Sequence, residues 1–288
     1  MTAATGVYRI FYRLLAAAGL LLFALLPIRA DGAENASPRL KYGIRIVCPG
    51  EYRGHLQGIA TDGKAVYWVF SRDIVKTGFD GKLLAKTAMP HHGGDPCWKD
   101  DKLYVPVCGS GFNRKLKPGA ESKNYVYVYD AKLKLVEKHH IPEMEFGAGG
   151  IAVRDGHFFI VGGRPEGTPG NTVYEYDADF KLLGRHEADF DSQKGIQTIE
   201  YVSGKWYFGC YGTGGVTIET DEKFHATRKL RPGIAVGMIP LAEGLVLVGR
   251  SAPGKVHNRK GASARVVRFT VPKQKKAPSP GSDDGKKR

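Results

Sequence analysis

Histidine, glutamine and aspartate residues gather at the start of two short apolar segments. His55 and Gln57 open the segment 55–71, and His91, His92 and Asp95 open a second segment 36 residues later. This set permits three chemistries: a divalent-metal site formed by His55, His91 and Asp95, a general base in which Asp95 orients His91, or hydrogen bonding to a polar ligand. The sequence leaves these open beside a structural role, in which the same groups hydrogen-bond one another and the backbone.

The segment 55–71 is the first of five similar copies. Each copy reads as an inner strand, a turn and an apolar second strand, and the copies begin near residues 55, 91, 147, 195 and 235. They can be stacked without gaps over these two strands, and third and fourth strands follow in most copies. A period of about 35 to 55 residues with only strand patterns inside indicates a β-propeller. We therefore predict an all-β, five-bladed β-propeller with four-stranded antiparallel blades.

The two ends of the repeat region complement each other. The last copy has a third strand that ends at Val271 and no fourth strand, whereas residues 40–48 form one strand too many before the first copy. If this N-terminal strand joins the last blade, the ring closes and no sheet edge stays open. We predict a propeller over residues 40–271 that is closed in this way.

The predicted ring brings the starts of the inner strands together at one mouth of the central channel. Loops and strand ends from all blades meet there, and propeller ligands bind at such places. We expect a polar cluster at this mouth, made of His55, Gln57, His91, His92, Asp95 and Gln197. Arg164 and Arg250 follow second strands on the same side, and we expect them to bind an anionic or sugar-like ligand.

A short motif at the start of the first copy resembles a known family. The run from His55 to Ile59 (HLQGI), followed by Tyr67-Trp68, resembles the opening repeat of the plant-type glutaminyl cyclotransferases, and residues 196–201 (IQTIEY) are similar to the motif of that family's fourth blade. The similarity touches all five copies and implies a five-bladed propeller. The second repeat of the family carries its acid/base glutamate in Phe-Gly-Glu-Gly, and Gly93 stands at that place here.

The first thirty residues are typical of an export signal. Arg9 and Arg13 precede an apolar run over 14–26, Pro27 breaks this run, and Ala30 offers a small residue for cleavage. A run of this length is too short to span a bilayer comfortably, so we predict a cleaved signal peptide and no membrane insertion of the mature protein. We expect a periplasmic or extracellular protein that begins after Ala30 with a polar lead over 31–39. The basic tail 272–288, rich in Lys, Pro and Ser, is predicted to be disordered.

Charge and cysteine content narrow the choice of partners. The formal net charge is +14, half of it in the first thirty and the last seventeen residues, and no dense Lys/Arg run is interleaved with aromatics. We therefore expect no nucleic-acid partner and a monomer. The four cysteines permit two disulfides, but none has the Cys-x-x-Cys spacing of a structural zinc site. A tight turn at Asp100-Asp101 would place Cys97 opposite a residue near Tyr104, which disfavours a Cys97–Cys108 disulfide across this hairpin. The sequence therefore allows buried free thiols as well as disulfides.

Two functions remain in view from the sequence. The first is an exported propeller that binds a small polar ligand or glycan, or serves as an interaction scaffold, through the channel mouth. The alternative is an enzyme: a hydrolase or lyase using the His/Asp cluster, or a diverged glutaminyl cyclotransferase-like acyltransferase. An approach of Asp95 to the histidines within about 4 Å would favour the metal or general-base chemistry.

Overall fold

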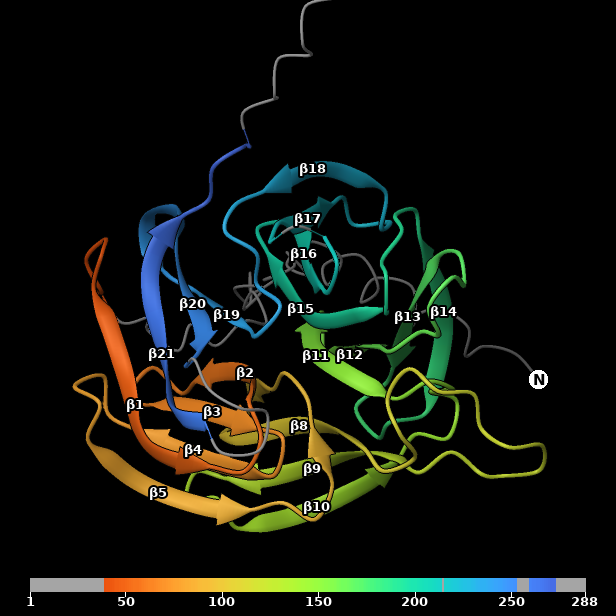
Figure 1. The fold of residues 1–288 in the computed structure, drawn as a ribbon, viewed down its shortest axis with the longest axis horizontal. Helices are drawn as coiled ribbons and strands as arrows, with labels where there is room; N and C mark the ends of the chain where they lie inside the picture. The colour runs from red at the N-terminus through yellow and green to blue at the C-terminus, as the bar shows by residue number, and fades with distance from the viewer. Residues whose placement is uncertain (1–38, 214, 253–258, 273–288) are drawn as a thin grey trace, which may run out of the picture. The chain divides into compact units, whose positions relative to one another are not determined.

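The computed structural model describes residues 39–213, 215–252 and 259–272 (Figure 1). The predicted signal peptide over 1–30 lies outside the described residues, as do the polar lead except Arg39 and the basic tail except Pro272. Within the described part, strands form five antiparallel sheets around a central axis. The prediction of an all-β, five-bladed propeller is therefore confirmed.

Blades one, three and four each consist of four consecutive strands, ordered from the axis outward. In blade one these are β2 (Leu56–Thr61), β3 (Val66–Phe70), β4 (Asp73–Thr77) and β5 (Leu83–Ala88). In blade three they are β11 (Ala148–Arg154), β12 (His157–Gly162), β13 (Asn171–Tyr176) and β14 (Leu182–Ala188). In blade four they are β15 (Ile196–Val202), β16 (Lys205–Cys210), β17 (Thr217–Thr220) and β18 (Ala226–Leu230).

The inner strand of blade two is divided into two pieces. These are β6 (His92–Gly93) and β7 (Cys97–Lys99), and both pair with β8 (Lys102–Cys108). The strands β9 (Asn124–Asp130) and β10 (Leu135–His140) complete the blade. The break falls over residues 94–96, which include Asp95, so blade two departs from the other blades at the position that carries its charged residue.

Blade five contains both ends of the described ring (Figure 1). Its inner strands are β19 (Met238–Pro240), β20 (Leu245–Ser251) and β21 (Arg259–Arg268), with the short 3-10 helix η1 (Ala242–Gly244) between the first two. The N-terminal strand β1 (Arg45–Tyr52) pairs with β21 in antiparallel fashion, with Arg45 opposite Arg265. The predicted ring closure is thus confirmed. The strand begins later than the predicted residue 40 because a turn precedes it, with Gly43 at φ 84°.

Aspartates fix the turns between the third and fourth strands of three blades. The side chain of Asp130 accepts hydrogen bonds from the backbone N–H groups of Lys132 and Lys134, both at 2.9 Å. Asp177 and Asp221 make the equivalent pairs of bonds in blades three and four. An aspartate that satisfies nearby backbone donors favours a turn at its position, which explains why these turns could be recognised in the sequence.

Large apolar side chains of the second strands fill the space between neighbouring blades. Trp68, at 0% exposure, shares a cluster with Leu247 of blade five, and Tyr104 of blade two packs in a cluster with Phe158 of blade three. Each blade therefore buries its apolar surface against the next one, as a propeller requires. The inner strands that border the polar axis are held in place by this packing.

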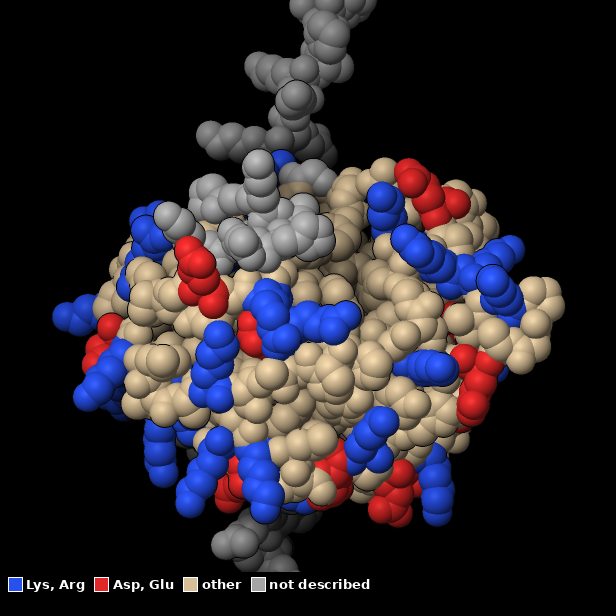
Figure 2. All heavy atoms as spheres, turned by 60° about the horizontal axis from the view of Figure 1, so that its bottom comes forward, with Lys and Arg blue, Asp and Glu red and all other residues tan. Residues whose placement is uncertain are grey.

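The surface of the described ring carries charges of both signs. Figure 2 shows lysine and arginine side chains interspersed with acidic ones over the face that it presents, without one continuous basic patch. The described residues include no helix that is long and apolar enough to cross a membrane. All four cysteines are free thiols, and Cys97 lies opposite Tyr104, as the turn at Asp100-Asp101 predicts.

Candidate functional site

The inner strand of blade two is shifted by two residues from the gapless stacking of the copies. In blades one, three and four the equivalent pairs across the first hairpin are Ile59–Trp68, Ile151–Ile160 and Ile199–Phe208. In blade two, the residue opposite Tyr104 is Cys97 and not Asp95. The hairpin turns at Asp100-Asp101, one residue later than the stacking assumes, and each pair across it therefore moves by two. The gapless stacking is wrong over this strand.

The corrected register makes Asp95 the counterpart of Gln57 and Gln197. In blades one and four, Gln57 and Gln197 lie where the ladder between the first two strands is irregular, between Leu56 and Gly58 and between Ile196 and Thr198. The shared register does not place the three side chains in one layer, because Asp95 bridges Gly150 of blade three, which is the counterpart of Gly58. All three are buried, with exposures of 5% for Gln57, 4% for Asp95 and 6% for Gln197.

Asp95 ties blade two to its neighbours at the axis. Its side-chain oxygen Oδ1 accepts a hydrogen bond of 3.2 Å from the backbone N–H of Ile59 in blade one. Its backbone forms a bridge to blade three: the Asp95 N–H donates to the Gly149 carbonyl at 2.7 Å, and the Ile151 N–H donates to the Asp95 carbonyl at 3.1 Å. These contacts give Asp95 a structural role that the sequence did not show.

Glycines make room for this carboxyl group. A methyl group added at Gly58 would overlap the Asp95 side chain, and one added at Gly237 would lie 2.6 Å from Asp95 Oδ1. Both glycines belong to inner strands of other blades or their approaches. The interpretation of the axial glycines as clearance for crowded strands is therefore supported by the geometry.

Three titratable groups influence one another near the axis. Burial, and secondarily the charge of Glu200, raises the pKa of Asp95 well above its ordinary value, and backbone N–H groups of Ile59 and Ile199 act in the opposite direction. Burial raises the pKa of Glu200 to about 8. Burial, followed by the charges of Glu200 and Asp95, raises the pKa of the Cys97 thiol. A low-polarity site disfavours the charged forms of acids, so the pKa values of all three groups shift in favour of their protonated forms.

A second polar cluster lies at the channel mouth and contains three of the predicted residues. The Gln57 amide nitrogen Nε2 lies 3.1 Å from both ring nitrogens of His55, 3.1 Å from Ser71 Oγ and 3.2 Å from His92 Nε2. Burial lowers the pKa of His92 to about 4, helped by the positive charges of His55 and Arg72. The His92 imidazole is therefore neutral near neutral pH and can donate or accept one hydrogen bond at each nitrogen.

The mouth also contains an aromatic side chain that the sequence reasoning missed. Phe112 belongs to the long loop 109–123 between β8 and β9, and its ring lies 6.4 Å from the His92 ring, at an angle of 25°. Methyl groups added at Gly147 or Gly149 would come within 2.7 or 3.2 Å of the Phe112 ring. The glycines of blade three thus leave space for Phe112 beside the polar cluster. A lone aromatic in a glycine-containing loop was the signal that could have pointed to it.

The structure does not form the predicted His91–Asp95 catalytic pair. The hydrogen bonds of Asp95 join backbone groups of blades one and three, and none joins Asp95 to His91 in the described part of the chain. His91 precedes β6 and is partly exposed. Nor does any group of three or more His, Cys, Asp or Glu in the described ranges have an arrangement that could hold a metal ion. The metal set His55, His91 and Asp95 is therefore not assembled in the described part of the chain, where Asp95 bonds backbone groups of blades one and three.

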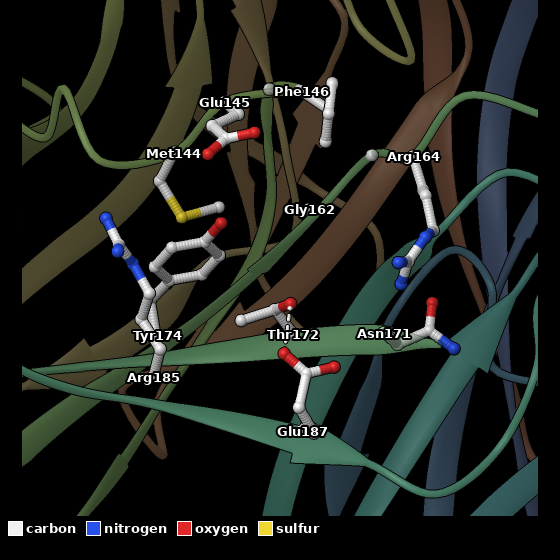
Figure 3. Close-up of a pocket in the computed structure, with 12 residues that line it drawn as sticks. Met144, Glu145, Phe146, Gly162, Arg164, Asn171, Thr172, Tyr174, Arg185 and Glu187 are labelled. Atoms are coloured by element: carbon white, nitrogen blue, oxygen red, sulfur yellow. Dashed lines mark hydrogen bonds between the residues drawn. The ribbon is translucent and has the colours of Figure 1, made fainter. Parts of the chain in front are cut away.

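A separate cavity of about 280 Å³ lies at the mouth end of blade three (Figure 3). It is lined by Met144, Glu145, Phe146, Gly147, Gly162, Gly163, Arg164, Asn171, Thr172, Tyr174, Arg185 and Glu187. We call it the blade-three cleft. Arg164, predicted as a ligand-binding residue, lines this cleft. Arg250 does not: it is exposed near the end of β20, opposite Ser263 of β21.

Comparison with known proteins supports the fold alone. No protein-family model and no curated protein sequence matches this chain. The crystal structure of Myxococcus xanthus glutaminyl cyclase is similar, with a TM-score of 0.55 and 10% identity over 81% of this chain and 100% of that one. A luciferin-regenerating enzyme gives a TM-score of 0.48 at 10% identity, covering 80% and 96% of the two chains. A Bacteroides caccae protein of unknown function gives 0.46 at 14%, covering 68% and 71%.

The chain is therefore a five-bladed β-propeller with a fold similar to that of a glutaminyl cyclase. The gapless stacking places the family's acid/base glutamate at Gly93, whereas the corrected register moves that place two residues on, to Asp95. A methyl group at Gly93 would overlap Met89 and lie 2.9 Å from Val69 Cγ1. Both neighbours belong to the apolar core between blades one and two, so a side chain at position 93 would have to displace them.

Proposed function

We propose that this protein is an exported β-propeller that binds a small, uncharged, sugar-like ligand at the mouth of its channel. The observation that carries the proposal is a pair of unsatisfied buried nitrogens. His92 Nδ1 and Gln197 Nε2 have no hydrogen-bond partner among the described residues. Buried polar atoms in folded proteins nearly always have a partner, so these two nitrogens favour a bound polar molecule at this end of the ring.

The chemistry of the mouth favours hydroxyl groups over charged groups. Gln57 and Gln197 supply amides, which both donate and accept hydrogen bonds, and the His92 imidazole is neutral because its pKa is lowered to about 4. Phe112 adds an apolar ring face beside His92. Hydrogen-bonding groups of both kinds around an aromatic face suit a polyhydroxy ligand with one apolar side.

A panel of neutral mono- and disaccharides and polyols tests this proposal. Binding is screened by thermal shift and measured by isothermal titration calorimetry. We expect at least one compound to bind, and Gln197→Ala to weaken its binding at least about tenfold. Gln193→Ala is the matched control, because Gln193 is exposed and bonds only Glu166 among the described residues. Absence of binding across the panel, or equal binding by Gln197→Ala and the parent protein, would contradict the proposal.

A second candidate function is acid–base catalysis inside the channel. Glu200 favours it, because a partly buried acid whose pKa is raised to about 8 can exchange a proton near neutral pH. A cyclotransferase-like activity is tested by ammonia release from a peptide with an N-terminal glutamine. Release that is lost in Glu200→Gln would support this candidate, and no release above the uncatalysed rate would exclude it for that substrate.

A further inference from the structure

We propose that the blade-three cleft is a second binding site, for a free α-amino acid, with Arg164 binding the carboxylate and Glu187 binding the ammonium group. This site is separate from the channel mouth, and none of the residues of the proposed sugar site lines it. The two proposals can therefore fail independently of each other.

The charged side chains of the cleft are left without ion-pair partners. Arg164, Arg185, Glu145 and Glu187 all line the same cavity, yet none of them forms an ion pair with another described residue. Figure 3 shows them on different walls, with Glu187 extending from β14 toward the cavity and the Arg164 guanidinium extending from the end of β12. Two positive and two negative groups give a cleft that is neutral in sum and suits a ligand with both charges.

Arg164 and Glu187 approach one point from two sides. A methyl group placed at Gly170 would lie 3.4 Å from Arg164 Nη1 and 3.4 Å from Glu187 Oε2, although the two side chains form no ion pair. The gap between them is therefore short enough for one small molecule to contact both. Arg164 Nε is also buried and has no hydrogen-bond partner in the described part of the chain, which marks an unused donor on the carboxylate-binding side.

Other contacts hold these two side chains in place. The Thr172 hydroxyl donates a hydrogen bond of 3.1 Å to Glu187 Oε1, which leaves Oε2 for a ligand. The backbone N–H of Arg164 donates to Asn113 Oδ1 at 2.9 Å, so the loop of blade two fixes the residue that carries the guanidinium. A site whose groups are positioned before the ligand arrives loses less entropy on binding.

The rest of the cleft leaves space for the ligand's side chain. Tyr174 lies between Arg164 and Arg185 in the view of Figure 3. The Arg185 guanidinium lies 5.8 Å from the centre of the Tyr174 ring. Asn171 is already occupied, since its amide bonds Phe190 and Ser192. The volume of about 280 Å³ is close to the lower limit of small-molecule pockets, which fits a single amino acid better than a peptide.

Calorimetric titration of the mature protein with L-serine and L-asparagine tests this site. For each, the carboxamide lacks the carboxylate and the N-acetyl form lacks the ammonium group. We expect the free amino acids to bind and both blocked forms to bind at least about tenfold more weakly. Equal binding of free and blocked forms, or no binding of either amino acid at millimolar concentration, would overturn the proposal.

Variants show whether binding occurs in this cleft. Arg164→Gln and Glu187→Gln are each expected to weaken binding of the free amino acid at least about tenfold. Arg114→Gln is the control, because Arg114 is exposed in the neighbouring loop and does not line the cleft. If Arg164→Gln does not fold, as judged by circular dichroism, the Glu187→Gln result decides. Unchanged affinity in the folded cleft variants would overturn the assignment.

Discussion

The channel axis and the blade-three cleft both contain ionisable side chains, but these differ in burial and in the bonds that they make. At the axis, Asp95 is 4% exposed, its side chain bonds the backbone of blade one, and burial raises its pKa. In the cleft, Arg164 and Glu187 border an open cavity and have no ion-pair partner in the described ranges. A charge deep in a fold must be bonded or neutralised, whereas a charge near the surface stays solvated at little cost. Unpaired charges are therefore better indicators of binding than buried ones here.

The largest expected effect comes from removing the axial carboxyl group. Asp95→Ala leaves the Ile59 N–H without its partner in a crowded site, and we expect a loss of about 3 kcal/mol in unfolding free energy. Asp95→Asn keeps an acceptor of the same shape and should cost less than half as much. Urea denaturation measures both. Asp101→Asn is the control, since Asp101 is exposed in the turn of the same hairpin. A cost below about 1 kcal/mol for Asp95→Ala would remove the contrast between axis and cleft.

Adding a methyl group to the inner strand β6 of blade two, at Gly93, should also destabilise the fold. Gly93→Ala places a methyl group against Met89 and Val69, and we expect a loss of about 2 kcal/mol from overpacking. At Gly184 of blade three, the nearest atom to such a methyl group is His186 Nε2 at 3.5 Å, so Gly184→Ala is expected to change stability by less than about 0.5 kcal/mol. Thermal unfolding of the two variants compares them. Equal effects would show that position 93 can accept a side chain.

A smaller effect is expected in the pH dependence of the unfolding free energy, through Glu200 near the axis. The pKa of Glu200 is raised from 4.5 to about 8, so its protonated form stabilises the fold fully below pH 4.5, and this contribution is lost as pH rises toward 8. Glu200→Gln should remove that slope and exceed the parent protein in stability by about 1 kcal/mol at pH 8. Unfolding is measured between pH 7 and pH 9, above the range in which His92 titrates. Parallel pH profiles of the two proteins would contradict the assignment.

The smallest effect is expected in the cleft. Because Arg164 and Glu187 form no ion pair with each other, the double variant Arg164→Gln/Glu187→Gln should unfold within about 0.5 kcal/mol of the parent protein. Urea denaturation of the double variant and the parent protein at pH 7 measures this difference. A loss above about 1 kcal/mol would show that these charges serve the fold, and the cleft would then resemble the axis.

Most of the fold could be predicted because each blade repeats the same local signals. Asp130, Asp177 and Asp221 bond turn backbone in the way that their positions in the sequence indicate. The unmatched strand at the start and the missing strand at the end identified the closure between β1 and β21. These signals are local or follow from counting strands, and neither depends on exact register.

The site was harder to predict because it depends on register and on loops. One residue of displacement at the Asp100-Asp101 turn moves Asp95 from the place of Ile59 to that of Gln57 in the pairing of the inner strand. The contacts of Gln57 with His55 and His92 agree with the expected polar cluster at the starts of neighbouring inner strands, although β6, which contains His92, is shifted as well. In the cleft, Glu187 lies on an outer strand, which reads as solvated in sequence, and only the fold of residues 162–171 brings Arg164 toward it.

The pairing of β1 with β21 also has a consequence for how the chain is made. The strand synthesised before all the other described strands finds its partner only when the last of them has emerged. Until then it presents an unsatisfied edge, which other strands can capture. A chain that stops before β21 would therefore leave two complementary edges open at once, on β1 and on β20. Such truncated chains should associate with one another rather than form a smaller ring. In the complete chain, the pairing of β1 with β21 covers both edges within one molecule.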